Sequence, residues 1–473
     1  MTRDPLSRRS LLAAAAAAAA LAVARPGLSQ ATVPASGTRP ARKPGTRKDV
    51  PPRMSFLAND RLKLGVDLAL GGAITHLSPA GDPATNLINS WDLGRQVQMS
   101  YYAGPVPYEV PGHAGPPEHW RHIGWNPIQV GDDYGNPGVV LEHRNDGREL
   151  YVKCRPMQWP LDDVPGECAF ELWATLDGPA ARVRCRLTMS RSDRTQYPAR
   201  TQELPAVYTN GPWHRLFTYA GEKPFEGDDL TLVKKRPDQK GPWSHWLATE
   251  NWAALVDDAD WGLGVWNPGC VAFSGGFSGK PGAGGPKDSP TGYIAPNRNE
   301  VLDHDCVHEY AYALVLGDLR SIRTWVYAQP RTPTPPAWVF EKDRNGWTYT
   351  NATDGGWPVK GELDVDLSGR NPQLVSPVVA WTAADAPKLT IDAAVTGSVS
   401  RVAVYWATAA DGGFSPKRVA ILPVKPDGQG RPYEVDLSKL EGYRGLITQL
   451  RIDPQPSGTA GDRVRVKAVR LGR

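Results

Sequence analysis

The chain has 473 residues, a net charge of +4 and 22% charged residues. The charge is uneven: the first 53 residues carry ten Lys/Arg and two Asp, a surplus of +8, which leaves −4 on the remaining 420. A nucleic-acid-binding domain needs a basic folded surface, so we exclude nucleic acid as a partner. The length beyond the basic start is ample for two domains.

Residues 1–31 have the pattern of an export signal. A basic start is followed by an apolar, mostly Ala run, which is too short to span a bilayer comfortably and is typical of a signal peptide. Arg8 and Arg9, set in Ser-Arg-Arg-Ser-Leu-Leu, resemble a twin-arginine signal, and an ordinary secretory signal is the alternative. We therefore expect a bacterial periplasmic or secreted protein that is not inserted in a membrane after signal removal.

The stretch 32–53 is rich in Pro, Gly and basic residues and predicts a disordered linker. Short β-type runs bounded by Gly, Pro, Asp and Asn follow, and we expect no helix longer than two turns. In one run, Arg182, Arg184 and Arg186 alternate with apolar residues, which indicates a strand with one buried face. The sequence predicts an all-β fold. In the first part of the chain, the predicted strands are 61–70, 138–144, 148–157, 168–176, 181–190, 252–258, 262–268, 308–317 and 321–329.

Four prolines within 329–338 mark a boundary between a domain of 54–332 and a second of 337–473. The second domain has the strand count of a jelly roll. It resembles the β-sandwich carbohydrate-binding modules that accompany secreted glycan-active enzymes. Its aromatic residues are either a stacking platform for sugar or core, and a sandwich that merely props the first domain is the alternative. The candidate platform residues are Trp347, Tyr349, Trp357, Trp381 and Trp406.

The start of the first domain, LKLGVDLALGGAITHLSPAGDPATNLINSWDLGR, has a Gly-Gly turn between two strands and then Asn and Gly-Arg. This stretch resembles the start of galactose-mutarotase-like β-supersandwiches. The resemblance implies a large antiparallel supersandwich with a sugar lying across a concave face. Mutarotases, glycoside hydrolases and polysaccharide lyases share that fold, so the fold does not choose among them. The excess of Trp (17) over Phe (8) also suits a sugar ligand.

Polar and aromatic residues gather in the segments 86–102, 118–135, 201–215 and 241–256, which are loops or strand ends flanked by Pro and Gly. Sites on β scaffolds usually lie in such segments. If the chain after Gly94 is a strand, its alternation directs Val97 and Met99 into the core, and Gln98 and Tyr102 into a groove. The candidate substrate-binding residues are Arg95, Gln98, Tyr102, His119, Trp120, Trp125, Trp213 and His214.

Glycoside hydrolysis needs two carboxyl groups, one protonated and one ionised. The candidate catalytic residues are Asp92, Glu203 and Glu250, together with His122. Glu203 stands among Leu, Pro, Ala and Val, so we expect partial burial to suit it as the acid. Asp92 has the alternative role of pairing with Arg95 to fix a loop. We predict an exported glycoside hydrolase acting on a polysaccharide or oligosaccharide.

Two alternatives remain. A lyase acting on a uronate-containing glycan would use Arg95 to neutralise the substrate carboxylate, with Tyr101, Tyr102, His119 or His122 as the base. A non-catalytic glycan-binding protein would use the same clusters without turnover. A mutarotase could also draw an acid and a base from them, but it acts on free sugar and needs neither an export signal nor an accessory sandwich.

The segment 303–309 has the His spacing of a metal site, since His304 and His308 are four residues apart, but strand character follows at once and HEXXH is absent. We therefore expect no metal there. The sequence also has no phosphate-binding loop, GxSxG elbow or kinase signature, so we expect no cofactor. The five cysteines either form two disulfides with one thiol left over, or all stay reduced.

Overall fold

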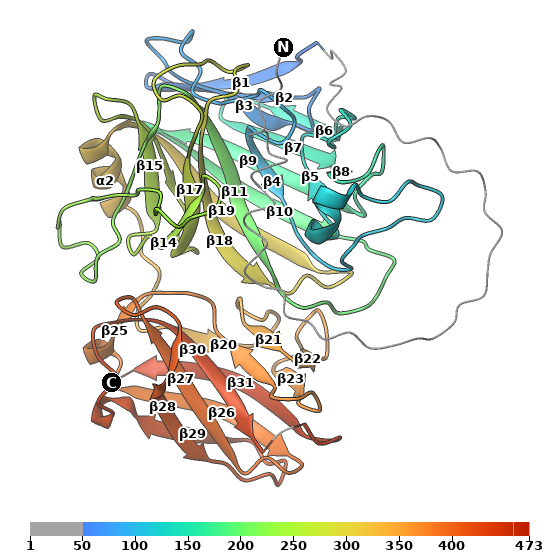
Figure 1. The fold of residues 1–473 in the computed structure, drawn as a ribbon, viewed down its shortest axis with the longest axis vertical. Coiled ribbons are helices and arrows are strands. Elements are labelled where there is room, and N and C mark those ends of the chain that lie inside the picture. Colours follow the sequence, from blue (N-terminus) through green and yellow to red (C-terminus); the bar gives the residue numbers. More distant parts are fainter. Residues whose placement is uncertain (1–50, 457, 473) are drawn as a thin grey trace.

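A computed structural model describes residues 51–456 and 458–472. The predicted export signal and nearly all of the predicted linker lie outside these residues. The predicted all-β class is confirmed, and all the strand pairs of the four sheets are antiparallel, as in the pairs β10·β19, β11·β18 and β26·β31. Figure 1 shows two units, with the sheets of β1–β19 above those of β20–β31. Among the described residues, no helix has the length and apolar character needed to cross a membrane.

The first unit consists of two large sheets. The ten-stranded sheet has the order β1 (Met54–Ala58), β2 (Leu62–Asp67), β3 (Ala73–Pro79), β4 (Val97–Ser100), β11 (Arg200–Asn210), β18 (Thr291–Glu300), β17 (Ala272–Ser278) and β14 (Ser244–Leu247), with β5 (Pro127–Ile128) on β4 and β8 (Met157–Gln158) on β5. The nine-stranded sheet has the order β13 (Thr231–Leu232), β12 (Arg215–Thr218), β15 (Trp252–Val256), β16 (Trp261–Trp266), β19 (Val307–Asp318), β10 (Ala180–Met189), β9 (Cys168–Asp177), β7 (Glu149–Arg155) and β6 (Val139–Asn145).

The second unit is a smaller sandwich of two six-stranded sheets. One sheet has the order β22 (Thr353–Asp354), β23 (Leu363–Asp366), β31 (Arg463–Gly472), β26 (Lys388–Thr396) and β29 (Arg431–Asp436), with β20 (Ala337–Val339) on β31. The other has the order β21 (Thr348–Thr350), β24 (Gln373–Val375), β30 (Leu446–Gln455), β27 (Arg401–Thr408) and β28 (Phe414–Pro423), with β25 (Trp381–Thr382) on β30. Short 3-10 helices are η1 (Glu118–Ile123), η2 (Ala383–Asp385) and η3 (Leu437–Lys439).

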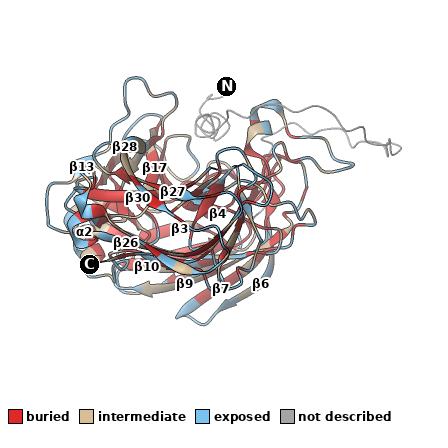
Figure 2. Cartoon of the chain, turned by 90° about the horizontal axis from the view of Figure 1, so that it is seen from below, coloured by how far each residue is buried: buried red, intermediate tan, exposed pale blue. Residues whose placement is uncertain are grey.

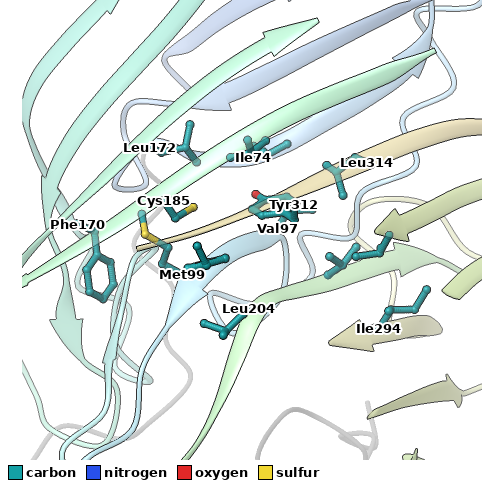
Figure 3. Close-up of a cluster of buried hydrophobic side chains, with 14 of the residues drawn as sticks. Ile74, Val97, Met99, Phe170, Leu172, Cys185, Leu204, Ile294, Tyr312 and Leu314 are labelled. Carbon is teal, nitrogen blue, oxygen red and sulfur yellow. The ribbon is translucent and has the colours of Figure 1, made fainter. Parts of the chain in front are cut away.

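The core of the first unit lies between its two large sheets (Figure 3). The alternation predicted on β10 is confirmed, since Val183, Cys185 and Leu187 are in this core while the arginines between them face outward. From the ten-stranded sheet, Val97 and Met99 reach the same core. On the outer side of the nine-stranded sheet, β6 carries exposed residues, β7 is exposed at its two ends, and β9 carries mainly half-buried residues (Figure 2). Because side chains alternate between the two faces of a strand, only the residues that point away from this core can form a site.

Three rings of the proposed sugar platform are in the core of the second unit. Trp347, Trp381 and Trp406 are each at most 2% exposed, so they cannot stack on a ligand. Tyr349 is in the same core. Trp357 instead packs against the core of the first unit. These aromatic residues stabilise the second unit and its junction with the first.

One segment departs from the predicted secondary structure. Residues 321–329 were expected to form a strand, but Leu319–Tyr327 is the nine-residue helix α2. Asp318 caps it by accepting a hydrogen bond from the Ser321 N–H, and Ile322 and Val326 are buried one turn apart. The helix covers the outer side of β15, β16 and β19, where it packs in a cluster with Trp252. The cap and the i, i+4 apolar pair are sequence signals that the strand prediction overlooked.

All five cysteines are buried and free. Burial raises the pKa of each thiol, to about 12 for Cys185, Cys270 and Cys306. Because only the thiolate reacts, we expect the folded protein to resist a thiol reagent such as Ellman's reagent and to bind five equivalents after denaturation. Fewer than five reactive thiols in the denatured, unreduced protein would instead reveal disulfide pairing.

Candidate active site

The candidate site lies on the side of the ten-stranded sheet that faces away from the core. On β11, Leu204 and Val207 are in the core between the sheets, whereas Ala206 and Tyr208 belong to a separate cluster. On β18, Ile294 is in the core, and its neighbours on either side join that separate cluster. The register shift between Glu203 and Val207 changes the alternation of β11 at this point. We call this side of the sheet the outer face.

Glu203 is at the centre of the outer face and is 8% exposed. The Tyr293 hydroxyl donates a 2.6 Å hydrogen bond to its Oε1, and the Tyr102 hydroxyl donates a 3.3 Å hydrogen bond to its Oε2. Burial, and then Glu203 itself, raise the pKa of Tyr293 well above its usual value. Tyr293 therefore stays a donor at neutral pH. Both oxygens of the Glu203 side chain accept a hydrogen bond, so two hydroxyl donors orient this carboxyl group.

Aromatic rings extend from Glu203 along the sheet. Tyr293 packs between Tyr208 and Trp243, with ring centroids 4.8 Å apart in both pairs. Each of these rings belongs to the outer-face cluster. The rings are tilted by 37° and 40° to one another, and Tyr208 and Tyr293 are only 1% and 2% exposed, so they support Glu203 from below rather than offer a stacking surface.

A second wall of the site comes from η1 and the loop after it. Tyr102 is in one cluster with Trp120 and Trp159. The Trp120 indole donates a 3.0 Å hydrogen bond to Oδ2 of Asp133. The rings of His119 and His122 lie 5.1 and 6.5 Å from the Trp120 ring. Trp120 is fully buried, so it supports this wall instead of binding substrate as predicted, while His119 and His122 lie next to it.

The loop of this wall is held by Asp132. Its carboxylate accepts hydrogen bonds from the backbone N–H groups of Tyr134, Asn136 and Asp163. Burial raises the pKa of Asp132 to about 6, against the opposing effect of these bonds. Asp132 therefore fixes the position of its neighbour Asp133.

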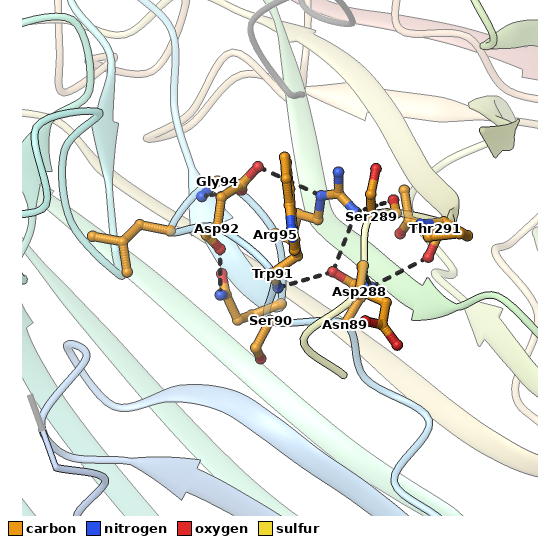
Figure 4. Close-up of polar contacts among 12 residues, drawn as sticks. Asn89, Ser90, Trp91, Asp92, Gly94, Arg95, Asp288, Ser289 and Thr291 are labelled. Carbon is orange, nitrogen blue, oxygen red and sulfur yellow. Dashed lines mark hydrogen bonds and ion pairs between the residues drawn. The ribbon is translucent and has the colours of Figure 1, made fainter. Parts of the chain in front are cut away.

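The other end of the site is the turn that contains Asp92 and Arg95 (Figure 4). Arg95 is fully buried, donates a 2.7 Å hydrogen bond to the Ser289 carbonyl, and lies 4.6 Å from the Trp91 ring. Asp92 accepts from the Gly94 N–H and lies 3.6 Å from Arg95 Nε. The Asn89 N–H donates to the carbonyl of Tyr208. The loop-fixing alternative for Asp92 and Arg95 thus matches their contacts, beside the Tyr208 end of the outer face.

Gln98 was expected to point into a groove, and this prediction is wrong. Its side chain is buried, donates to the carbonyls of Leu93 and Arg95, and accepts from the Val130 N–H. The reason is that β4 begins only at Val97, so the preceding turn needs a partner for its carbonyl groups. Gln98 therefore holds the turn, whereas the expectation for Tyr102 agrees with its contact to Glu203.

Glu250, Trp125, Trp213 and His214 do not join the site. Glu250 is at 0% exposure under α2, where Arg323 donates to both of its oxygens. Trp125 and Trp213 pack in the core between the sheets. The chain at His214 pairs with Val256 of β15, on the nine-stranded sheet. Core packing explains where the two tryptophans lie, and the neutralising contact with Arg323 explains the burial of Glu250, so neither requires a ligand.

The two histidines of the considered metal pattern do not converge. His304 lies near Asp305 at the surface, while His308 Nδ1 is 3.0 Å from the Tyr101 hydroxyl inside the core. Among the residues that the structure describes, no group of three or more His, Cys, Asp or Glu could hold a metal ion.

Sequence reasoning missed Tyr293, and it did not select Asp133, Tyr208 or Trp243. These last three residues stood in the polar-aromatic segments that were recognised. Tyr293 stands in a plain strand, and its neighbourhood to Glu203 comes from the pairing of β11 with β18, which no local pattern reveals.

No protein-family model and no curated protein matches the sequence. Among solved structures, a galactose mutarotase related enzyme from Lactobacillus acidophilus is 10% identical with a TM-score of 0.35, covering 56% of this chain and 97% of its own. A galactose mutarotase-like protein from Clostridium acetobutylicum is 8% identical with a TM-score of 0.37, covering 56% and 95%. A 4-alpha-glucanotransferase from Thermococcus litoralis is 11% identical with a TM-score of 0.30, covering 57% and 40%. All three TM-scores are below 0.5, so these similarities do not indicate a function for this chain.

The Glu250 contacts lead to a stability prediction. Arg323, Tyr327 and Trp252 all donate to this buried carboxylate. We expect Glu250→Gln to lower the free energy of unfolding by about 3 kcal/mol, because it leaves Arg323 without its counter-charge. Urea denaturation measures this, with Glu142→Gln on the exposed strand β6 as the matched control.

The effect should depend on pH. Burial acts to raise the pKa of Glu250, but the donors outweigh it and lower that pKa below its usual value. A depressed folded-state pKa contributes stability above the unfolded pKa of about 4.3 and loses it as the pH falls. The difference between wild type and Glu250→Gln should therefore shrink below about pH 4. A difference that stays constant down to acid unfolding would contradict the role of the charge.

Proposed function

We propose that the chain is an exported carbohydrate-active enzyme that hydrolyses glycosidic bonds on the outer face of the ten-stranded sheet. The observation that carries this proposal is the Glu203 carboxylate, held between the hydroxyls of Tyr293 and Tyr102 and continued by the rings of Tyr208 and Trp243. The buried rings hold Glu203 in place, and Glu203 supplies one of the carboxyl groups that glycoside hydrolysis requires.

Hydrolysis needs a second carboxyl group that protonates the leaving oxygen as the C–O bond breaks. The chain offers Asp133 beside the Tyr102 end of the site and Asp92 beside the Tyr208 end. Glu203 would then activate water or attack the anomeric carbon itself. His119 and His122 flank the Trp120 wall and would bind substrate hydroxyl groups.

The tyrosines favour hydrolysis over lyase chemistry. A lyase base must accept a proton, but Tyr293 has a raised pKa and donates its proton to Glu203. Tyr101, another candidate base, is buried in the core with its pKa well above the usual value. Arg95, the proposed neutraliser, is engaged by the Ser289 carbonyl.

Turnover of a glycan panel tests the proposal. We expect reducing ends to appear without the ultraviolet absorbance of an unsaturated product, and Glu203→Gln to lower turnover by about 10²–10⁴-fold while binding persists. Glu142→Gln is the control. Asp92→Asn and Asp133→Asn identify the acid. Binding with no product on any glycan would support a non-catalytic glycan-binding protein instead, and absorbance of an unsaturated product would support a lyase.

The two tyrosines should not be equivalent. Tyr293→Phe removes the 2.6 Å hydrogen bond and Tyr102→Phe the 3.3 Å one. We expect Tyr293→Phe to lower kcat by about 10–100-fold and Tyr102→Phe to lower it by less. The reason is that the shorter of two hydrogen bonds to a carboxylate is the stronger one. Tyr151→Phe removes a similar Tyr–Glu bond on the nine-stranded sheet and should leave kcat unchanged. Equal losses for all three variants would reject the orienting role.

A further inference from the structure

A buried polar cluster joins the two units. Arg344 of the second unit is 5% exposed, and its guanidinium donates to both carboxylate oxygens of Asp354 at 2.6 Å. Its Nη1 also lies 2.7 Å from Oδ2 of Asp303, which belongs to the first unit. Tyr349 completes the cluster by donating to Asp354 at 2.9 Å. One guanidinium thus neutralises a carboxylate from each unit.

Gln196 adds a second cross-connection. Its Nε2 donates to Asp354 at 2.7 Å and to Asp303 at 3.2 Å, and its Oε1 accepts from the Asp354 N–H at 3.0 Å. Both the side chain and the backbone of Asp354 are therefore held by a residue of the first unit. We call Gln196, Asp303, Arg344, Tyr349 and Asp354 the junction cluster.

Apolar contacts surround the junction cluster. Val301 of the first unit is counted in the core of the second, and Ala199 packs against that core. In the opposite direction, Trp357 packs against the core of the first unit. A freely tethered module would not exchange core residues with its neighbour.

The junction cluster is next to the strands that carry the site. Gln196 stands just before β11, which begins at Arg200 and bears Glu203. Asp303 stands just after β18, which bears Tyr293 and ends at Glu300. The second unit therefore holds the ends of both strands whose pairing brings Glu203 and Tyr293 together.

Near the same end of β18, a second set of buried polar residues reaches the end of β4. Glu300 is ion-paired with Arg298, whose Nη2 donates to His308 Nε2 at 3.0 Å. His308 in turn contacts the Tyr101 hydroxyl, and the next residue, Tyr102, donates to Glu203. The same end of β4 is thus fixed on its core side by His308 and on its outer face by Glu203.

We propose that the second unit is a brace: through the junction cluster it positions β11 and β18, and with them the Glu203 carboxylate. Gln196 and Arg344 are positioning residues in this account. The expected effect on catalysis rests on the proposed role of Glu203. The expected effect on how rigidly β11 and β18 are held does not depend on that role.

Hydrogen exchange of the full chain tests the brace. Arg344→Met leaves two buried carboxylates without their cation, and Gln196→Ala removes only the cross-connecting amide. We expect Arg344→Met to speed amide exchange in 200–210 and 291–300 by about tenfold or more, and Gln196→Ala to speed it less in the same strands. Exchange in β9 should stay as in wild type. Arg463→Met, which breaks the exposed pair with Asp364 in the second unit, is the matched control.

Unchanged exchange in β11 and β18 for both variants would overturn the brace, and so would equal acceleration by Arg463→Met. If Arg344→Met does not fold, hydrogen exchange of Gln196→Ala in β11 and β18 tests the brace by itself. The readout needs no substrate, so an inactive wild type would reject the proposed function and leave the exchange result standing. With an active wild type, Gln196→Ala should lower kcat more than it raises KM.

Discussion

The first unit depends on one constraint, the burial of the facing sides of its ten-stranded and nine-stranded sheets against each other. That packing places Val97, Met99 and Leu204 in one core with residues from β9, β10 and β19. Because side chains alternate along a strand, the residues between them must face outward. The outer face of the ten-stranded sheet is rich in tyrosine, tryptophan and carboxylate where a plain sandwich would have small polar residues. The composition of that face is what points to a ligand.

Three buried carboxylates illustrate how surroundings separate structural from reactive groups. Glu250 and Asp354 are each ion-paired with an arginine, and the pKa of each carboxyl group is lowered although burial alone would raise it. Such pairs are costly to break and hold α2 and the second unit in place. Glu203 accepts hydrogen bonds from the hydroxyls of Tyr102 and Tyr293. These hydroxyls orient the carboxylate that we propose for chemistry at an anomeric carbon.

Local patterns were enough to predict the β class, the apolar face of β10 and the burial of Val97 and Met99 in the core. They failed where pairing between distant strands decides the outcome. Glu250 and Glu203 look alike in sequence, but only the approach of Arg323 from α2 shows that Glu250 is structural. In the sequence, the tryptophans of the second unit likewise look like a binding platform, but in the structure Trp347 and Trp406 lie in the core of the sandwich. Tyr293 carries no local signal, because its role arises from the register of β11 with β18.

The most direct test of the central claim is a crystal structure of the Glu203→Gln protein with a bound oligosaccharide that the wild-type protein cleaves or retains. The account predicts a sugar on the outer face of the ten-stranded sheet, with a glycosidic oxygen or anomeric carbon next to residue 203. A sugar bound only to the second unit, or to the nine-stranded sheet, would contradict it.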